Sequence, residues 1–376
     1  MRILFLALDI DLVHQRGDTI HAVELARALD LMGHDVTLVV GANGSARKLL
    51  PPHVDVHVAR GSNWRVVRAI RELAPKVRAE VVYERRFSPK IGTAVRALVG
   101  APLVLEVNGI LREELSHGGG SVLKPRLVKD RIRAELLRRV DRIVAVTSSI
   151  GEDLVQTYGV DPSRIRVVGN GVDTERFVPR DKESACREAG LPQRPRIVFV
   201  GNIAGWRDFG VVLQSLPPIR KSISDVELLV VGAGPDEHRV RSQARELGLG
   251  TAVRFAGLVP YERVPSLIAA SDLGLLPEKP REVEISPLKL FEYFACARPV
   301  LASRVRGLEF VDHYGLGKLY EAGNSGELAA LAQDILLDST CRAEMGNRAR
   351  SFVEHERSWS AVAARVAGVL GEVIHG

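Results

Sequence analysis

The sequence contains few cysteines and no long apolar run. Its 376 residues include three cysteines, which are widely separated and odd in number: Cys186, Cys296 and Cys341. This pattern argues against a disulfide framework or a metal site and suits a reducing compartment. No apolar run approaches the length of a membrane span. The apolar residues 1–8 end at Asp9 and Asp11, so they predict a first buried strand rather than a signal peptide.

Two motifs that would define other functions are also absent. The chain has no G-x-G-x-x-G segment, which argues against a dinucleotide-dependent dehydrogenase. It has no aromatic motif of the kind that stacks RNA bases. Its hydrophobic content of 46% and charged content of 26% are those of an ordinary soluble protein. A chain of this length predicts two domains.

Positive charge is concentrated in the first half of the chain. The net charge is +6, and residues 58–142 contain 19 Lys and Arg against 9 Asp and Glu. This surplus indicates an anionic partner, for which an acidic lipid surface, a phosphorylated acceptor and nucleic acid are the options. The alternative is a solvated, arginine-rich surface without a specific partner.

Strands and helices alternate along both halves. The segments 2–8 and 35–40 predict strands on either side of a helix, which is the opening unit of a parallel sheet. A second series of buried strands starts at Arg196, after a polar segment. The sequence therefore predicts an α/β protein with two Rossmann-like parallel-sheet domains. Their expected bounds are 1–173 and 195–355, with a linker at 174–194 and a final helix at 356–376.

The stretch from Glu284 to Pro299 carries the clearest chemical pattern. Ser286 predicts a helix N-cap, Pro287 suits the first helical position, and apolar residues follow at helical spacing. Lys289 would lie in the first turn, where the helix dipole disfavours a cation. This lysine either extends into solvent or, with the free N–H groups, forms a phosphate site. Glu284 and Glu292 could accept hydrogen bonds from sugar and ribose hydroxyls.

The same stretch resembles a known family signature. Glu-x7-Glu ahead of Ala-x-x-x-Pro-Val, with Ser-Pro-Leu-Lys-Leu-Phe-Glu-Tyr inside it, is similar to the signature of retaining glycosyltransferases of the GT-B fold, family four (group 1). Further similar motifs occur in order: a glycine loop at Gly17, Gly-His-Asp-Val at 33–36 and Asn-Gly-Val-Asp at 170–173. The resemblance extends from Met1 to about Ile374. It implies a GT-B architecture whose last helix crosses back to the first domain.

The resemblance implies roles for residues of the donor site. Gly17 would contact the donor phosphate, and the turn ending near Val259 would hold the nucleobase. Arg207 stands where the family has a phosphate-binding lysine, whereas Asn202 replaces the family's arginine, so Lys289 is expected to supply the missing charge. Glu292 would bind the ribose and Glu284 the donor sugar, with Glu282 as a competitor of the wrong spacing. The helix start formed by Ser286, Pro287 and Leu288 would face the diphosphate.

The acceptor side is less well defined. Asn108 lies at the strand end where many relatives carry a histidine near the reacting sugar, and His21 is a second candidate. A triglycine at 118–120 precedes the basic segment 124–139, which we interpret as an acceptor lid, a contact to acidic membrane or an ordinary exposed helix.

The implied reaction is hexosyl transfer from a nucleotide-diphosphate sugar to an acceptor hydroxyl with retention of configuration. UDP-sugar is the first expectation and GDP-mannose the next, with a glycan, a lipid-linked glycan or a small alcohol as acceptor. The resemblance implies front-side attack with the leaving phosphate oxygen as base, a donor bound between the domains, and no cofactor or metal. We interpret Asp9-x-Asp11 as a strand end, and expect a cytoplasmic enzyme with a peripheral contact to the inner membrane face. The alternatives are a GT-B sugar-nucleotide epimerase and a basic, non-enzymatic glycan- or nucleic-acid-binding protein, although no nucleic-acid partner is expected.

Overall fold

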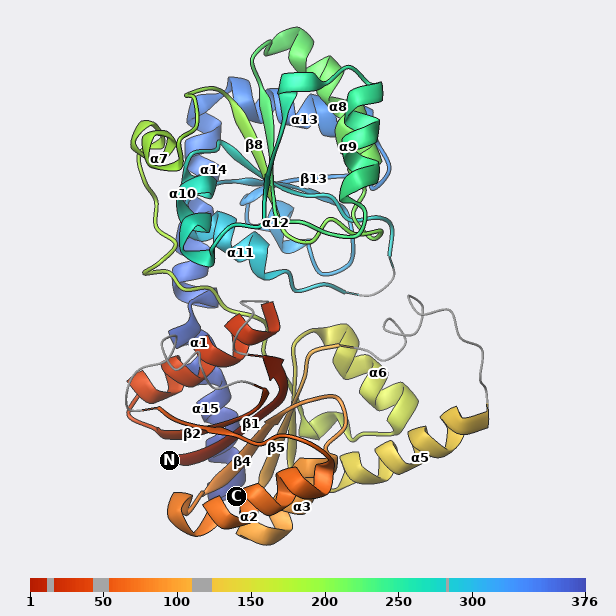
Figure 1. Cartoon of the computed structure of the whole chain (residues 1–376), viewed down its shortest axis with the longest axis vertical. Coiled ribbons are helices and arrows are strands. Elements are labelled where there is room, and N and C mark those ends of the chain that lie inside the picture. The colour runs from red at the N-terminus through yellow and green to blue at the C-terminus, as the bar shows by residue number, and fades with distance from the viewer. Residues whose placement is uncertain (12–16, 43–53, 110–123, 282–283) are drawn as a thin grey trace. The chain divides into compact units, whose positions relative to one another are not determined.

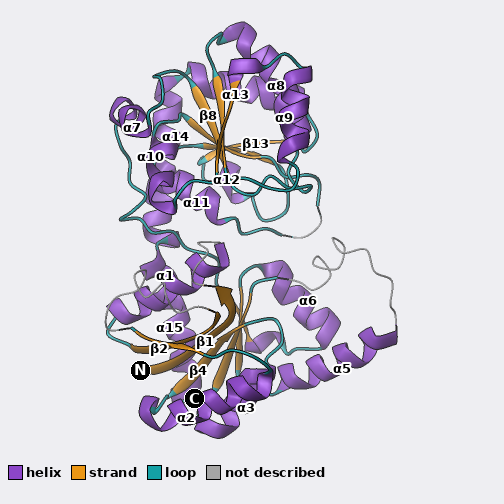
Figure 2. Ribbon diagram, viewed as in Figure 1, coloured by secondary structure: helices purple, strands orange, loops and turns teal. Residues whose placement is uncertain are grey.

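The chain folds into two compact units. The computed structural model describes residues 1–11, 17–42, 54–109, 124–281 and 284–376. One unit comprises Met1–Asn170 together with Trp359–Gly376, and the other comprises Gly171–Ser358 (Figure 1). Each unit contains one all-parallel sheet with helices on its faces (Figure 2). The predicted α/β class with two Rossmann-like domains is therefore confirmed.

The first unit is built on a seven-stranded sheet in the order β3-β2-β1-β4-β5-β6-β7. Its strands are β1 (Arg2–Asp11), β2 (Asp35–Ala42), β3 (Asp55–Val58), β4 (Val81–Arg85), β5 (Leu103–Val107), β6 (Arg142–Ala145) and β7 (Ile165–Val167). Its helices are α1 (Gly17–Leu31), α2 (Asn63–Val77), α3 (Lys90–Val99), α5 (Lys124–Arg138), α6 (Ser148–Tyr158) and α15 (Trp359–His375). Strands that are buried on both faces consist of continuous apolar runs, so they can be predicted from the sequence.

The second unit is built on a six-stranded sheet in the order β10-β9-β8-β11-β12-β13. Its strands are β8 (Arg196–Val200), β9 (Glu227–Val231), β10 (Val253–Gly257), β11 (Leu273–Leu276), β12 (Val300–Ser303) and β13 (Gly317–Tyr320). Its helices are α7 (Lys182–Ala189), α8 (Phe209–Ser222), α9 (Glu237–Glu246), α10 (Val264–Ala269), α11 (Leu288–Ala295), α12 (Phe310–His313), α13 (Ser325–Leu337) and α14 (Ser339–Phe352). A short π-helical turn, Val353–Arg357, follows α14.

Helices cover both faces of each sheet. In the first unit, α15 lies beside α1 and contacts β4, β5 and β6, while α3 packs on the opposite face together with α2 (Figure 1). In the second unit, α8, α9 and α13 bury an apolar cluster against the sheet, and α11 packs on β11 and β12. Burial of this apolar surface is the main stabilising contribution within each unit.

Both sheets reverse their strand order beside the first strand of the unit. In the first unit β1 lies between β2 and β4, and in the second β8 lies between β9 and β11. The carboxyl ends of the two strands at such a reversal diverge into connections on opposite faces, which leaves a crevice that binds ligands in open α/β sheets. The β1–β4 and β8–β11 ends are therefore the places where the two units can hold ligands.

Several local predictions differ from the structure. Helix α11 begins at Leu288, and Pro287, not Ser286, occupies the N-cap position, because Pro287 is extended with ψ of 118°. The predicted linker 174–194 contains α7, which packs on α10. The triglycine and Glu282 lie outside the described residues. Within the described ranges, no helix combines the length and apolar character needed to cross a membrane.

Candidate active site

An ion pair occupies the strand reversal of the second unit. Arg207 follows β8 and its guanidinium contacts the carboxylate of Glu278, which follows β11. The side chains are 13% and 2% exposed, and the two backbones also form an isolated antiparallel bridge. Burial lowers the pKa of Arg207 to about 10, so it remains charged at neutral pH. Its Nε has no hydrogen-bond partner among the described residues.

A buried tyrosine ties the two strands together beneath this ion pair. The hydroxyl of Tyr293 on α11 accepts the N–H of Val200 at 2.7 Å and donates to the carbonyl of Leu275 at 3.4 Å. These residues lie near the ends of β8 and β11. Desolvation by burial raises the pKa of the Tyr293 hydroxyl, so it stays protonated and donates. The strand ends are therefore held at a defined separation.

Glu292 on α11 is a buried carboxylate with one satisfied oxygen. The residue is 2% exposed. Its Oε1 accepts hydrogen bonds from the Tyr261 hydroxyl at 3.1 Å and from Lys289 Nζ at 3.0 Å. Its Oε2 is buried and has no partner within the described part of the chain. A buried carboxylate oxygen without a donor is costly, by about 1–3 kcal/mol or more, which makes this atom a candidate ligand contact.

Lys289 lies in the first turn of α11, as the sequence predicts. Its side chain does not simply extend into solvent, because it contacts other residues of the second unit. Its side chain is 22% exposed, forms the ion pair with Glu292 and places Nζ 5.2 Å from the centre of the Tyr261 ring. The aromatic face and the carboxylate hold the ammonium group at the helix N-terminus. Lys289 and Glu292 thus form one unit of opposite charges rather than an isolated cation.

Glu284 is positioned by a glycine. It precedes α11, is partly buried, and its Cγ lies 2.3 Å from where a Cβ on Gly307 would stand. Gly307 has φ of +91°, a left-handed conformation that glycine adopts without strain. Ile285 N–H donates to the Arg306 carbonyl at 3.3 Å, which anchors the same segment to the loop after β12. Ser286 and Pro287 complete this segment and are partly buried.

Asn202 and Val259 lie in loops at the carboxyl ends of β8 and β10, which are separated in the sheet by β9. Asn202 follows β8 and is exposed. Its Oδ1 lies 2.4 Å from where a Cβ on residue 234 would stand, so the Asn202 side chain can lie this close to the backbone only because residue 234 is glycine. Val259 follows β10 and is partly buried, whereas the preceding Leu258 is 83% exposed. All predicted donor-site residues except Gly17 belong to this second unit.

The first unit has a buried polar cluster at its own strand reversal. His21 on α1 is 4% exposed, and its Nε2 lies 2.8 Å from Glu106 Oε1 on β5. His21 Nδ1 lies 2.8 Å from Asn170 Oδ1, and the imidazole packs edge-on against Trp359 at 5.1 Å. Burial alone would raise the pKa of Glu106, but His21, Arg85 and the Tyr83 hydroxyl lower it to about 2.

The remaining predicted residues of the first unit lie around this cluster. Arg85 at the end of β4 is 3.4 Å from Glu106 and 3.6 Å from Asp9 at the end of β1. Asn108 follows β5 and is exposed. Gly17 is the exposed first residue of α1. The structure thus places the His21 side chain against Glu106 of β5, the strand that ends directly before Asn108.

Sequence reasoning assigned no role to three buried partners: Tyr261, Glu278 and Glu106. Glu278 and Glu106 could have been noticed because each is an acidic residue within or directly after a run of apolar strand residues, where an unpaired charge would be unfavourable. Tyr261 carries no such signal, since it contacts Glu292 across 31 residues of sequence.

Comparisons with known proteins place these features in a family. Residues 181–352 match the family described as glycosyl transferases group 1, and residues 16–176 match the one described as glycosyltransferase family 4. D-inositol 3-phosphate glycosyltransferase 2 of Catenulispora acidiphila is 29% identical, covering 99% of this chain and 95% of that protein. A D-inositol 3-phosphate glycosyltransferase of Rhodococcus opacus is 31% identical, covering 77% and 67%.

A solved structure shows the same fold over nearly the whole chain. The crystal structure of Anabaena HepE in complex with UDP and glucose aligns with a TM-score of 0.76 at 21% identity, covering 99% of both chains. This likeness establishes the GT-B fold, while the sequence matches establish the relationship. The chain therefore belongs to the group 1 glycosyltransferases of family 4, and it is an enzyme that transfers sugars.

Proposed function

We propose that this glycosyltransferase moves a hexose from a nucleotide-diphosphate sugar, with UDP as the preferred nucleotide, to an acceptor hydroxyl with retention of configuration. The observation that carries the proposal is the unpartnered Oε2 of Glu292. Tyr261 and Lys289 occupy Oε1 and fix the carboxylate, so Oε2 can accept hydrogen bonds from the vicinal hydroxyls of a ribose. GDP-mannose is the second donor to be tested.

The charge of the leaving diphosphate would be stabilised by fixed cations. Arg207 is held by Glu278 with its Nε still unpartnered among the described residues, and Lys289 lies at the N-terminus of α11. A preorganised cation stabilises developing charge better than a mobile one because no reorganisation is needed during the reaction. Lys289 would thereby supply the charge that Asn202 lacks. Glu284 would bind the hydroxyls of the donor sugar, the turn at Val259 the base, and Gly17 the donor phosphate.

Retention would follow from front-side attack, in which the leaving phosphate oxygen takes the proton of the acceptor hydroxyl. This route needs no protein nucleophile, and the proposal assigns none. His21 and Asn108 would orient the acceptor. The names of the bacterial relatives favour a hydroxyl of a small polyol. The proposal assigns no metal, since Asp9 is engaged with Arg85. Unchanged turnover in EDTA is expected, and a loss that Mg²⁺ restores would contradict this part.

A transfer assay tests the proposal directly. The full-length enzyme is incubated with UDP-glucose, UDP-N-acetylglucosamine or GDP-mannose and a panel of polyols, and the product anomer is assigned by NMR. We expect one donor to give an α-linked product, and we expect Glu292→Gln to abolish turnover. An inverted product would contradict the mechanism. Formation of an epimerised nucleotide sugar without any acceptor would indicate instead that the protein is a sugar-nucleotide epimerase.

A further inference from the structure

A side-chain hydroxyl stands in place of a backbone hydrogen bond at the strand reversal of the second unit. The paired register of β8 and β11 ends at Val198 and Gly274. In a regular parallel ladder, the next hydrogen bond would run from the Val200 N–H to the Leu275 carbonyl. The Tyr293 hydroxyl lies between these two groups instead, accepting from Val200 at 2.7 Å and donating to Leu275 at 3.4 Å. It thus replaces the bond that would join the two strand ends directly.

The ring of Tyr293 fits against β11 only because residue 274 is glycine. A Cβ at this position would stand 2.5 Å from Cγ and Cδ2 of the ring. Tyr293 is fully buried, and desolvation raises the pKa of its hydroxyl, so the group stays neutral and can both accept and donate. The Val200 N–H and the Leu275 carbonyl are thereby satisfied without contacting each other. The tyrosine therefore acts as a spacer between the carboxyl ends of β8 and β11.

The two connections that leave these strand ends pair again beyond the spacer. The backbone N–H groups of Asp208 and Lys279 each donate to a carbonyl of the opposite connection, at 2.8 and 2.9 Å. Between them lie Arg207 and Glu278, whose backbones form the antiparallel bridge and whose side chains form the ion pair. The position of the Arg207 guanidinium therefore depends on the separation of the strand ends, which the Tyr293 hydroxyl sets.

The same tyrosine also fixes α11 relative to these strand ends. Tyr293 directly follows Glu292, whose Oε1 is occupied by Tyr261 and Lys289. Beyond the effect of burial, Glu292 raises the pKa of the Tyr293 hydroxyl and Arg207 lowers it, so the hydroxyl lies within the field of both charges. One side chain thus connects the helix that carries the carboxylate to the connections that carry the guanidinium.

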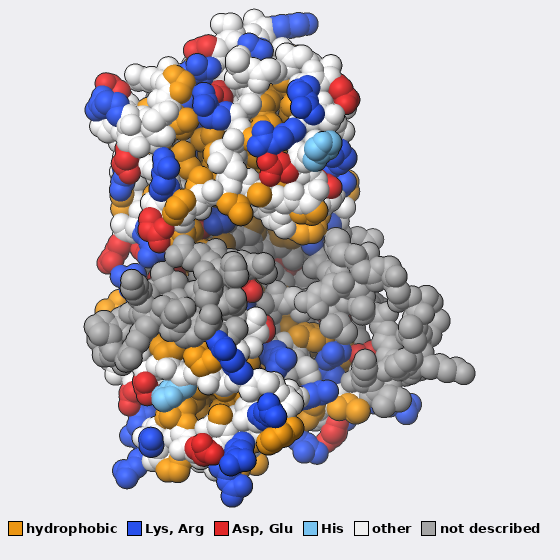
Figure 3. All heavy atoms as spheres, viewed as in Figure 1, with side chains coloured by type: hydrophobic (Ala, Val, Ile, Leu, Met, Phe, Trp, Pro, Cys, Tyr) orange, Lys and Arg blue, Asp and Glu red, His pale blue; other side chains and the backbone are white. Residues whose placement is uncertain are grey.

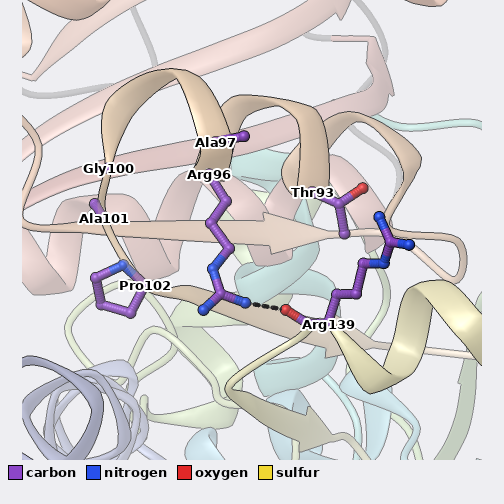
Figure 4. Close-up of a pocket in the computed structure, with 7 residues that line it drawn as sticks. All are labelled: Thr93, Arg96, Ala97, Gly100, Ala101, Pro102 and Arg139. Atoms are coloured by element: carbon purple, nitrogen blue, oxygen red, sulfur yellow. Dashed lines mark hydrogen bonds between the residues drawn. The ribbon is translucent and has the colours of Figure 1, made fainter.

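Cations near a cavity do not by themselves form such an arrangement. A pocket of about 640 Å³ in the first unit is lined by residues that include Arg96 and Arg139 (Figure 4). There, Arg96 donates to the Arg139 carbonyl and to Asp141 at 2.9 Å, so its charge is already paired. Basic side chains are also spread over the visible face of both units (Figure 3). Arg207 differs from these, because it is mostly buried at a strand reversal and its Nε has no partner among the described residues.

We propose that Tyr293 is a positioning residue of the transfer reaction, which sets the place of the Arg207 guanidinium relative to Glu292. The inference rests on the proposed function, in which Arg207 stabilises the leaving diphosphate and Glu292 binds the ribose. Tyr293 would not contact the substrate, since backbone groups occupy its hydroxyl on both sides. Its loss should act on the rate through Arg207. The nucleotide contact of Glu292 should persist, because Tyr261 and Lys289 hold that carboxylate independently.

Tyr293→Phe tests this role, because phenylalanine keeps the ring against Gly274 and removes only the hydroxyl. The full-length variant is assayed with the nucleotide sugar and polyol that the wild type uses, and binding of UDP or GDP, whichever matches that donor, is measured by calorimetric titration. We expect kcat to fall about tenfold, because a displaced cation stabilises the transition state less well. The Kd of the nucleoside diphosphate should stay within about threefold of the wild-type value.

A second buried tyrosine of the same unit provides the control. The hydroxyl of Tyr320 accepts from Ser303 Oγ at 2.9 Å, at the ends of β12 and β13 rather than at the β8–β11 reversal. Tyr320→Phe should lower the Tm as Tyr293→Phe does, since both remove a buried hydrogen bond, but it should leave kcat within about twofold of the wild type. Equal losses of kcat in the two variants would mean that Tyr293 acts only through stability and would overturn the inference.

A double variant gives a readout that a general loosening of the fold would not change. In the Arg207→Gln background, Tyr293 has no guanidinium to position, so Tyr293→Phe should lower kcat by less than about a further twofold, while its effect on the Tm persists. A loss of about tenfold in both backgrounds would overturn the inference. Gly274→Ala is a second route, because the added methyl group would displace the ring while the hydroxyl is retained. It should give the same pattern of kcat values.

These measurements distinguish failure of the inference from failure of the proposed function. If the wild type transfers sugar and Tyr293→Phe matches its kcat, the positioning role fails while the proposed function stands. If Arg207→Gln keeps wild-type turnover, the proposed action of Arg207 on the diphosphate fails, and the positioning role fails with it. Absence of transfer by the wild type from UDP-glucose, UDP-N-acetylglucosamine and GDP-mannose would overturn both.

Discussion

The hydroxyl of Tyr261 donates a hydrogen bond to Glu292 Oε1 over 3.1 Å, and both residues are buried. Through this bond a turn at the end of β10 fixes a carboxylate on α11. The ammonium group of Lys289 donates to the same oxygen. The second oxygen, Oε2, has no partner among the described residues and can accept a hydrogen bond from a ligand. The proposed donor site therefore depends on Tyr261, which lies outside the family signature.

Tyr261→Phe should weaken nucleotide binding with little effect on the fold. The phenylalanine keeps the ring that packs against Phe177 and lies near Lys289, but it removes the hydrogen bond that orients Glu292. One such bond contributes about 0.5–1.5 kcal/mol, so the nucleotide Kd should rise roughly three- to tenfold. Titration of UDP checks this, with the exposed Tyr314→Phe as the control. Equal Kd values in both variants would show that Tyr261 does not position Glu292.

Single and double variants of the Arg207–Glu278 pair should distinguish its effect on stability from its effect on catalysis. Arg207→Gln leaves the buried Glu278 carboxylate with only the longer contact to Arg281 Nη1, at 3.6 Å, which should cost about 3 kcal/mol of unfolding free energy. It should also lower kcat about 100-fold, because a fixed donor to the leaving diphosphate is lost. The double variant Arg207→Gln/Glu278→Gln should recover most of the stability but not the turnover. Recovered turnover in the double variant would mean that the arginine charge does not act on the donor.

Lys289→Ala should damage catalysis more than the removal of a surface lysine. It takes away the cation at the start of α11 and leaves Tyr261 as the remaining partner of Glu292 Oε1. We expect kcat/KM to fall about tenfold or more, in line with the loss of a charge-assisted hydrogen bond. Lys318→Ala, which removes an exposed lysine of β13, is the comparison and should behave like the wild type. Wild-type turnover in Lys289→Ala would refute the proposed compensation for Asn202.

Glu84 on β4 should make the stability depend on pH. Burial raises its pKa to about 8, although Gly92 N–H donates to Oε2 at 3.0 Å and opposes the shift. Because the folded-state pKa is raised above the ordinary value of 4.5, the stabilising contribution is complete below 4.5 and is lost as pH rises towards 8. Glu84→Gln removes this loss. At pH 8 the variant should exceed the wild type by about 1–3 kcal/mol in unfolding free energy.

Urea unfolding at two pH values checks the sign of this effect. At pH 4 the two proteins should be similarly stable, since Glu84 is then largely protonated in both the folded and the unfolded state, and the gap should widen as the pH rises from 4.5 to 8. Glu72→Gln, which removes an exposed glutamate of α2, should show no such gap. A difference that is larger at pH 4 than at pH 8 would contradict the assignment.

Much of the fold was predictable from the sequence because its strands are buried on both faces. The predicted strands 2–8 and 35–40 lie within β1 and β2, which extend two or three residues further, and the second series of strands begins at Arg196 as predicted. Helix α7 was missed because it has only eight residues and a largely polar surface, so its apolar period is weak.

The candidate site was predictable where a residue's own position carries the signal. Lys289 in a first helical turn and Glu292 within an apolar helix face both stand out from their immediate neighbours. The pairings of Glu292 with Tyr261, of Arg207 with Glu278 and of His21 with Glu106 join segments that are distant in sequence. These contacts arise from the order of strands in each sheet, and no local pattern specifies them.

The most direct test of the account is the binding of nucleoside diphosphates to the wild type and to Glu292→Gln. Thermal unfolding is followed with UDP, GDP, ADP and dTDP, and with NAD as a control. A ligand present at a hundred times its Kd stabilises the native state by about 2.7 kcal/mol, which is visible as a rise in Tm. We expect that one diphosphate, UDP first, raises the Tm of the wild type and loses this effect in Glu292→Gln. A flat response to all four diphosphates, or an equal response in the variant, would contradict it.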